Sequence, residues 1–141
     1  MDPQLIALTK QVAAAHGLDP ALVCAIVEQE SSWNPWATRY EPAFYQRYIL
    51  PIAAHMTPTE AYGRAWSYGL MQLMGECARE HGYAGDLAAL CDPQTGLEQG
   101  CVHFATKLKT AAGDTAKALQ LWNGGGNAQY SAQVLSKLGK Y

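Results

Sequence analysis

One glutamate occupies a position where its side chain could act as an acid. Glu30 continues the apolar face of a predicted helix, whereas Glu28 lies on the opposite, polar face. The apolar residues on that face recur at helical spacing: Val23, Ile26 and Val27. Burial among apolar side chains raises the pKa of a carboxyl group, because burial disfavours the charged form. A general acid that works near neutral pH requires such a raised pKa.

The same helix is predicted to end shortly after Glu30. Pro35 cannot continue a helix, and it pushes Asn34 towards extended geometry. The carboxyl end of a helix carries partial negative charge, which also raises the pKa of a nearby carboxyl group. The alternative is structural: Glu30 could be a helix-ending residue whose carboxylate reaches the solvent.

Two later segments, residues 67–74 and 121–125, place polar side chains near glycines. Each of these side chains has a possible structural role as well as a possible role in a site. The structural roles are a polar helix start for Gln72, core packing for Met74 and Trp122, and a helix C-cap for Asn123.

Taken in order, these segments resemble the soluble-type lytic transglycosylase domain, which is related to goose-type lysozyme. The family pattern joins a helix ending in Glu-Ser, an aromatic-Asn-Pro, a Gly-Leu-Met-Gln run and a later aromatic-Asn-x-Gly. The matching residues are Glu30-Ser31, Trp33-Asn34-Pro35, Gly69-Leu70-Met71-Gln72 and Trp122-Asn123-Gly124-Gly125. Any one motif is weak, but three in the right order make a strong signal, which covers roughly residues 18 to 130.

The resemblance implies an all-α, lysozyme-like fold and cleavage of the β-1,4 bond between N-acetylmuramic acid and N-acetylglucosamine. It assigns the catalytic acid to Glu30. It also implies residues that bind the glycan along a cleft or lie beside the acid: Ser67, Gln72, Met74, Trp122 and Asn123.

The sequence departs from the family pattern at two points. Trp122 stands where the family usually has Tyr, and an indole donates a hydrogen bond but cannot accept one. The resemblance therefore supplies no hydroxyl contact to Glu30 at this position. The spacing from Glu30 to Gly69 is also longer than in the family, and the extra residues fill the segment 36–65. Ser67 is the best candidate for the family's cleft serine.

The mechanism follows from the resemblance and from the number of carboxylates. Most glycosidases use two carboxylates, whereas only Glu30 is placed as a catalytic group by its motif. A transglycosylase fits this pattern, since one group acts first as acid and then as base. The expected product carries 1,6-anhydromuramic acid, and no metal or cofactor is required.

Two alternatives remain open. The first is a goose-lysozyme-like muramidase that hydrolyses the same bond, with Glu41 or Glu60 of the segment 36–65 holding the water. The second is a non-catalytic module that only binds peptidoglycan. In either case Tyr40 and Tyr62 could line one wall of the sugar cleft, or they could pack in the core.

Helices must position these residues. Start signals at Asp2-Pro3, Asp19-Pro20, Thr57-Pro58, Asp92-Pro93 and Asp114 predict helices after each of them. Further helices are expected from Ser67 to about Gly82, from Asp86 to Leu90 and from Asn127 to Gly139. One more short helix is expected before Pro51, through which it joins the helix that starts at Thr57. No convincing strand pattern is present. The sequence therefore predicts one all-α domain, residues 1–141, of eight or nine short helices.

Composition excludes several classes of protein. Hydrophobic residues make up 49% and charged residues 16% of the chain, which is typical of a globular protein. A net charge of -2 argues against nucleic-acid binding. No CxxC pair is present, so zinc is not expected. Free thiols are predicted for Cys24, Cys77, Cys91 and Cys101, with a Cys91–Cys101 bridge as the alternative.

The expected partner is the peptidoglycan glycan strand, and the expected state is a monomer without a membrane span. The protein should therefore act on the cell wall, in the periplasm or outside the cell. Residues 1–10 contain no secretory signal. Release through a membrane lesion, as by a phage endolysin, delivery by a secretion or tail apparatus, and trimming of a periplasmic enzyme all remain possible.

Overall fold

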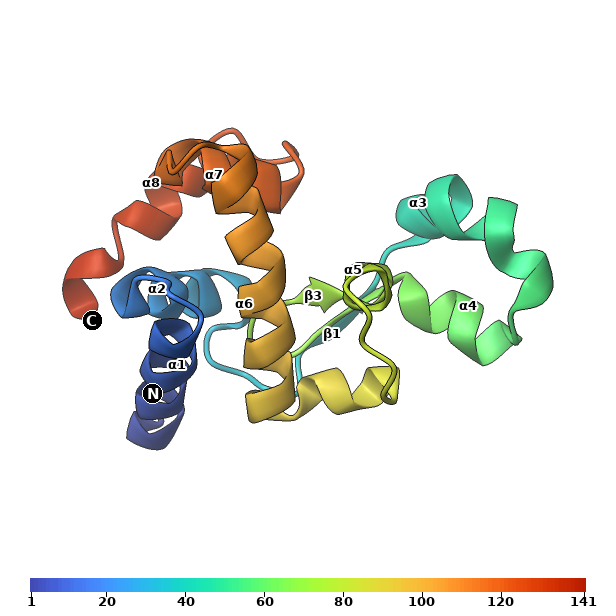
Figure 1. The fold of residues 1–141 in the computed structure, drawn as a ribbon, viewed down its shortest axis with the longest axis horizontal. Helices are drawn as coiled ribbons and strands as arrows, with labels where there is room; N and C mark the ends of the chain where they lie inside the picture. Colours follow the sequence, from blue (N-terminus) through green and yellow to red (C-terminus); the bar gives the residue numbers. More distant parts are fainter.

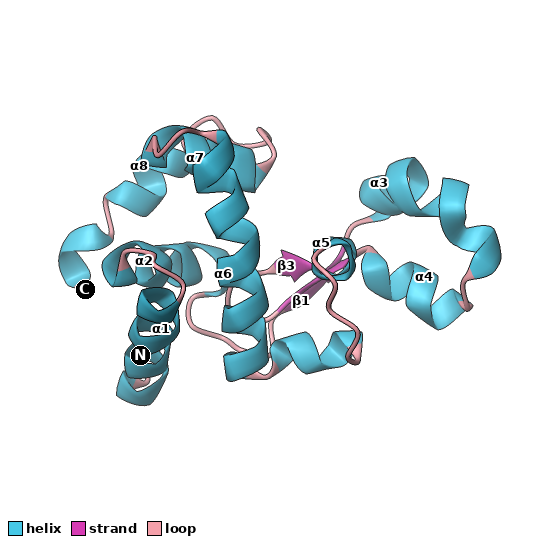
Figure 2. Cartoon of the chain, in the orientation of Figure 1, coloured by secondary structure: helices cyan, strands magenta, loops and turns pink.

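The computed structural model describes residues 1–141. Its elements, in chain order, are α1 (Pro3–Ala15), α2 (Pro20–Ser31), β1 (Thr38–Tyr40), α3 (Pro42–Phe44), the π-helix η1 (Tyr45–Ile49), the 3₁₀-helix η2 (Leu50–His55), α4 (Pro58–Arg64), β2 (Trp66–Tyr68), β3 (Leu73–Met74), α5 (Gly75–Glu80), the 3₁₀-helix η3 (Leu87–Cys91), α6 (Pro93–Thr110), α7 (Thr115–Asn123), α8 (Tyr130–Leu135) and the 3₁₀-helix η4 (Leu138–Lys140). The fold is all-α, as predicted, with one small sheet (Figures 1 and 2).

The predicted helix starts are confirmed by their capping bonds. Side chains accept hydrogen bonds from backbone N–H groups of the first turn at Asp2, Asp19, Thr57, Asp92 and Asp114. Each cap satisfies a donor that the helix itself cannot pair, which stabilises the start by about 1 kcal/mol. Asp86 differs, because it precedes a 3₁₀-helix and makes no capping bond.

The main core surrounds α2. Val23, Ile26 and Val27 have no solvent exposure, and burial of each such side chain contributes about 1.5–3 kcal/mol to the free energy of folding. The helix contacts α1, α8 and η4, so its carboxyl end is held from several directions. Figure 1 shows α2 between the amino-terminal helix and the carboxyl-terminal segment.

Most of the segment that the sequence marked as extra forms a separate lobe, residues 41–65. Its helices α3 and α4 lie apart from α1, α2, α7 and α8 in Figure 1. The lobe has its own small core, formed by Tyr45, Ile49, Ala61 and Ala65. Two short helices joined through Pro51 were expected here, and α4 is the second of them. Pro51 does not separate them, because it lies inside η2, and α3, η1 and η2 follow one another without a break.

The predicted helix from Ser67 to Gly82 is wrong in its first half. The chain forms β2, a tight turn and β3 before α5 begins at Gly75. The turn needs positive φ angles at Gly69 (72°) and Gln72 (51°), which a helix does not allow. A Cβ at Gly69 would lie 2.6 Å from the backbone oxygen of Leu90, so only glycine fits there.

The carboxyl-terminal prediction is also only partly right. The expected helix from Asn127 to Gly139 is split into α8 and η4. Asn127 instead caps a turn, in which its side-chain oxygen accepts a hydrogen bond from the backbone of Gln129.

The three strands form one antiparallel sheet in the order β1-β2-β3 (Figure 2). Their register places Arg39 opposite Ser67, and Ser67 opposite Met74. Side chains of one row point to the same face of a sheet, and neighbouring rows point to the other face. The row Arg39–Ser67–Met74 therefore faces one way, and the residues that flank it on β1 and β2 face the other.

Candidate active site

A cleft of about 700 Å³ lies at the carboxyl end of α2. It collects most of the residues that the sequence singled out, together with several that it did not. The lining residues are Glu30, Arg39, Glu41, Phe44, Ser67, Gln72, Leu73, Met74, Cys77, His103, Trp122, Asn123, Gly126 and Asn127. The cleft is thus lined by residues of the helices α2, α5, α6 and α7, of the sheet and of the lobe.

Glu30 is partly buried in the last turn of α2, and two side chains donate hydrogen bonds to its Oε1 atom. The donors are the indole Nε1 of Trp122 at 3.1 Å and the hydroxyl of Tyr130 at 2.6 Å. Burial raises the pKa of Glu30, and the hydrogen bonds from Tyr130 and Trp122 act in the opposite direction by stabilising the carboxylate. The group is therefore suited to hold a proton and also to release it.

Tyr130 was missed by the sequence reasoning. The hydroxyl that Trp122 lacks is supplied by this tyrosine, at the first position of α8. Tyr130 is 3% exposed and belongs to the main core, four residues before the buried Val134. This four-residue spacing was the only sequence signal for Tyr130. It is typical of core packing, so it could not mark Tyr130 as a site residue.

Trp122 is fixed by packing as well as by its hydrogen bond to Glu30. Its ring meets Phe104 edge-on at 5.7 Å, and it lies 5.5 Å from the ring of His103. His103 in turn shares a 2.7 Å hydrogen bond with His81. Burial is the main cause that lowers the pKa of His103 to about 4, so this imidazole is neutral at pH 7. His81 and His103 are 22 positions apart in the chain, but the fold pairs them, and His103 lines the cleft.

Gln72 and Ser67 lie in the cleft, but they bind mainly to one another and to the backbone. Ser67 Oγ donates to Gln72 Oε1 at 3.0 Å. Gln72 Nε2 donates to the carbonyls of Ala37 (2.8 Å) and Gly69 (2.9 Å). The interpretation of Gln72 as a helix-start residue is wrong, because it sits in the β2–β3 turn. Its side chain ties that turn to Ala37, the residue before β1.

The wall of the cleft formed by β1 and the start of the lobe carries charge. Arg39 Nε pairs with Glu41 at 3.1 Å, and the Arg39 side chain is 75% exposed. Phe44 lies on the same side of the cleft and packs on Tyr48 with ring centroids 4.9 Å apart. Glu41 is therefore a second carboxylate within the cleft, as one alternative required.

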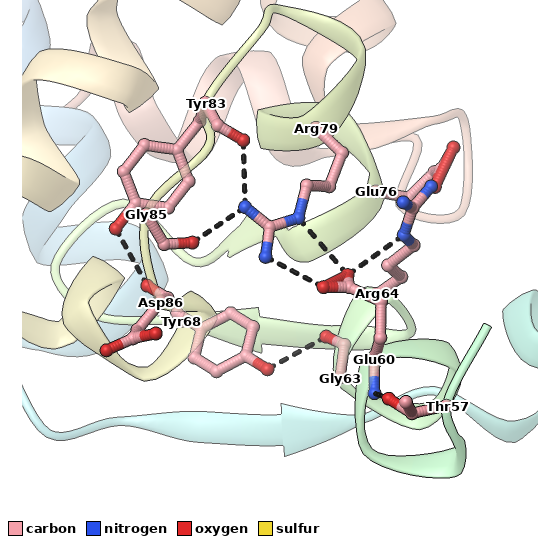
Figure 3. A network of polar contacts seen from close by, with 10 residues as sticks. All are labelled: Thr57, Glu60, Gly63, Arg64, Tyr68, Glu76, Arg79, Tyr83, Gly85 and Asp86. Carbon is pink, nitrogen blue, oxygen red and sulfur yellow. Dashed lines mark hydrogen bonds and ion pairs between the residues drawn. The ribbon is translucent and has the colours of Figure 1, made fainter.

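Glu60 does not reach the cleft. Both of its oxygens are engaged: Oε1 by Arg79 Nη2 (2.8 Å), and Oε2 by Arg79 Nε (3.1 Å) and Arg64 Nε (3.0 Å). Figure 3 shows this network joining α4 to α5 and to the turn at Tyr83 and Gly85. The two arginines lower the pKa of Glu60, so it stays ionised.

Tyr40 and Tyr62 are absent from the cleft as well. Tyr40 packs against Tyr45, Tyr62 and Trp66 at centroid distances of 5.7–6.4 Å. Tyr62 stacks on Tyr45 at 4.6 Å and lines a different groove. Neither side chain forms the expected sugar-binding wall next to Glu30.

Asn123 closes α7 and organises the glycine-rich loop. In the amide orientation that satisfies both side-chain atoms, its oxygen accepts hydrogen bonds from the backbone N–H groups of Asn127 (2.9 Å) and Gly126 (3.2 Å). Gly124 takes the left-handed conformation (φ 79°) that ends the helix. This loop forms the edge of the cleft beside Glu30.

The chain contains no group of three or more His, Cys, Asp or Glu side chains placed to hold a metal ion. All four cysteines are free, and Cys91 and Cys101 form no bridge. None of the helices combines the length and the apolar character needed to cross a membrane.

Comparison with known proteins agrees with this geometry. A family model described as the transglycosylase SLT domain matches residues 7–138. No curated protein and no solved structure matches the chain with significance. The matched range includes α2, the sheet and α7, the elements that line the cleft. The chain therefore belongs to the transglycosylase SLT domain family, with its lysozyme-like fold and a peptidoglycan-cleaving function of the lytic transglycosylase type.

Proposed function

We propose that the protein cleaves the β-1,4 bond between N-acetylmuramic acid and N-acetylglucosamine by transglycosylation, with Glu30 as acid and then base. The observation that carries this proposal is the asymmetry of the Glu30 carboxyl group. Oε1 accepts two hydrogen bonds, whereas Oε2 makes none. The acidic proton is thus assigned to Oε2, within the cleft that Glu30 lines.

In the first step Oε2 of Glu30 donates its proton to the glycosidic oxygen. The bond between C1 of the muramic acid and that oxygen breaks, and its electron pair leaves with the N-acetylglucosamine. The N-acetyl group of the muramic acid stabilises the positive charge at C1. Glu30 becomes a carboxylate, and the donors Tyr130 and Trp122 stabilise the new charge on Oε1.

In the second step the Glu30 carboxylate accepts a proton from the 6-hydroxyl of the same muramic acid. The oxygen of that hydroxyl forms a bond to C1 and closes the 1,6-anhydro ring. Glu30 is protonated again, and no water is consumed. Burial favours the protonated form at both ends of this cycle, and the two donors keep the ionised form accessible.

A second candidate function is hydrolysis, and Glu41 is the observation that favours it. Glu41 lies in the cleft and could hold a water molecule, whereas Glu60 is occupied by Arg64 and Arg79. Mass spectrometry of digested peptidoglycan separates the two reactions, because an anhydro end is lighter than a reducing end by one water. Products with only reducing ends would overturn the transglycosylase proposal.

We also infer that residues 1–141 act as one catalytic unit, as a monomer, on the cell wall in the periplasm or outside the cell. The cleft draws its lining from Glu30 through Asn127, so removal of either half would dismantle it. A light-scattering mass of 15.3 kDa during turnover would support the monomer. A dimer as the only active species would contradict it.

A further inference from the structure

The sheet separates the cleft from a second groove. The row Arg39–Ser67–Met74 lines the cleft, whereas Thr38, Trp66 and Tyr68, which flank that row, line the groove on the other side. The alternation of side chains along a strand produces this division. The groove has a volume of about 760 Å³, which is within the range of small-ligand sites. Its other lining residues are Thr57, Thr59, Glu60, Tyr62, Gly63, Arg79, Asp86, Leu87 and Ala88.

The groove offers aromatic faces and hydroxyl groups. Tyr62 is 49% exposed, and Trp66 is half-buried beside it. The hydroxyls belong to three threonines, of which Thr57 also caps α4. Aromatic faces pack against the C–H groups of pyranose rings, and hydroxyl groups pair with sugar hydroxyls. This combination suits a carbohydrate.

The charges in the groove disfavour phosphate polymers. Arg79 is its only cation, and four hydrogen bonds already hold it: two to Glu60 and one each to the carbonyls of Tyr83 and Gly85 (Figure 3). The carboxylate of Asp86 is exposed and makes no hydrogen bond or ion pair. The groove therefore presents a free acceptor and excess negative charge, which repel phosphate polymers.

We propose that this groove is a second, non-catalytic binding site for the glycan of peptidoglycan. The proposal rests on the proposed function for the identity of the polymer. Sugar rings would stack on Tyr62 and Trp66, while Asp86 accepts hydrogen bonds from sugar hydroxyls. Peptidoglycan repeats the same disaccharide many times, so one sacculus can occupy both sites. Binding at the groove then raises the local concentration of glycan at the cleft.

The test uses two variants that leave the cleft untouched, Asp86→Asn and Tyr62→Ala. Asp86 makes no side-chain bond, so its substitution should not disturb the fold. Tyr62 stacks on Tyr45, and thermal unfolding must show that its variant remains folded. The matched controls are Glu80→Gln, an exposed acid, and Trp36→Ala, an aromatic residue that is 77% exposed. Neither control residue lines either site.

The first measurement is binding to intact sacculi, made with Glu30→Gln protein so that the substrate survives. We expect the affinity to fall by about three- to tenfold in both groove variants and not in the controls, because each lost contact is worth about 1 kcal/mol. Affinities equal to those of the controls would overturn the proposal. This binding measurement does not depend on which product the native protein releases. A failure of the proposed reaction can therefore be told apart from a failure of the second binding site.

The second measurement is turnover with Glu30 restored. Lysis of insoluble sacculi should slow in the groove variants, whereas turnover of a short soluble glycan that fills only the cleft should stay unchanged. Equal losses on both substrates would show that these residues act through the cleft, and the proposal would fail. A short cationic peptide serves as a competing probe. Saturable binding of that peptide at the groove, with no binding of an uncharged N-acetylglucosamine oligomer, would also overturn it.

Discussion

The hydroxyl of Tyr130 lies 2.6 Å from Oε1 of Glu30, although the two residues are 100 positions apart in the chain. The contact joins the end of α2 to the start of α8. Tyr130 is buried, and burial together with the adjacent Glu30 raises its own pKa. Its hydroxyl therefore remains a donor at every pH at which the protein would act.

Removal of this donor should change both the rate and the pH dependence. Tyr130→Phe is expected to lower kcat roughly ten- to hundredfold, because a hydrogen bond to a charged group contributes about 1.5–3 kcal/mol. The bond lowers the pKa of Glu30, so its loss raises that pKa and shifts the alkaline limb of the kcat profile to higher pH. A limb that stays in place, or moves down, contradicts the assignment. Tyr48→Phe, which alters an exposed hydroxyl, is the control.

Substitution of the acid itself should separate activity from stability. Glu30→Gln is expected to lower the rate of wall lysis by about 10²- to 10⁴-fold. The glutamine oxygen still accepts hydrogen bonds from Trp122 and Tyr130, so the fold should persist. Unchanged turnover would remove Glu30 from the mechanism. If the native protein sediments with sacculi but releases no fragments, the non-catalytic alternative is correct.

The same variant should be more stable than the native protein at neutral pH. The folded pKa of Glu30 is raised above its usual value of 4.5, so the folded state binds more protons than the unfolded state in the interval between them. Native stability is therefore lost as the pH rises through that interval, and the Glu30→Gln variant avoids this loss because its amide does not ionise. Urea unfolding at several pH values measures the difference. A difference that does not grow with pH would show that Glu30 ionises normally.

Glu41 distinguishes transglycosylation from hydrolysis. If Glu30 works alone, Glu41→Gln should retain turnover within about fivefold, because its partly exposed pair with Arg39 contributes only about 0.2–1 kcal/mol. Digests by the variant should still end in anhydro sugars. Loss of turnover by several orders of magnitude, with reducing ends from the native protein, would favour the hydrolytic alternative.

Glu60 should matter for stability rather than for chemistry. Glu60→Gln leaves Arg79 and Arg64 without their shared partner, which is expected to cost about 1–3 kcal/mol, between the values for exposed and buried pairs. The pKa of Glu60 is lowered in the fold, so its contribution is present above about pH 4.5 and disappears as the pH falls through the folded pKa. Chemical unfolding of Glu60→Gln and of the exposed control Glu80→Gln checks this. A loss as large at low pH as at pH 7 would contradict an ionic origin.

The sequence predicted those features of the fold and the site that depend on residues close together in the chain. Glu30 on an apolar helix face, and the aspartate caps before α1, α2, α6 and α7, depend on neighbours within a few positions. Gln72 could not be placed in that way, because its side chain also bonds to the carbonyl of Ala37, which is 35 positions away in the chain. The roles of Tyr130 and Glu60 could not be predicted from the sequence for the same reason. Their roles depend on partners that only tertiary packing brings close.

The register of β1 has a consequence for how this protein can vary in length. An insertion or deletion that shifts β1 by one residue against β2 would exchange the two faces of the strand. Arg39 would then leave the cleft, and Thr38 would leave the groove, without any substitution at either site. We expect related chains to differ in length within residues 45–57 instead, where the lobe can grow or shrink without altering the register.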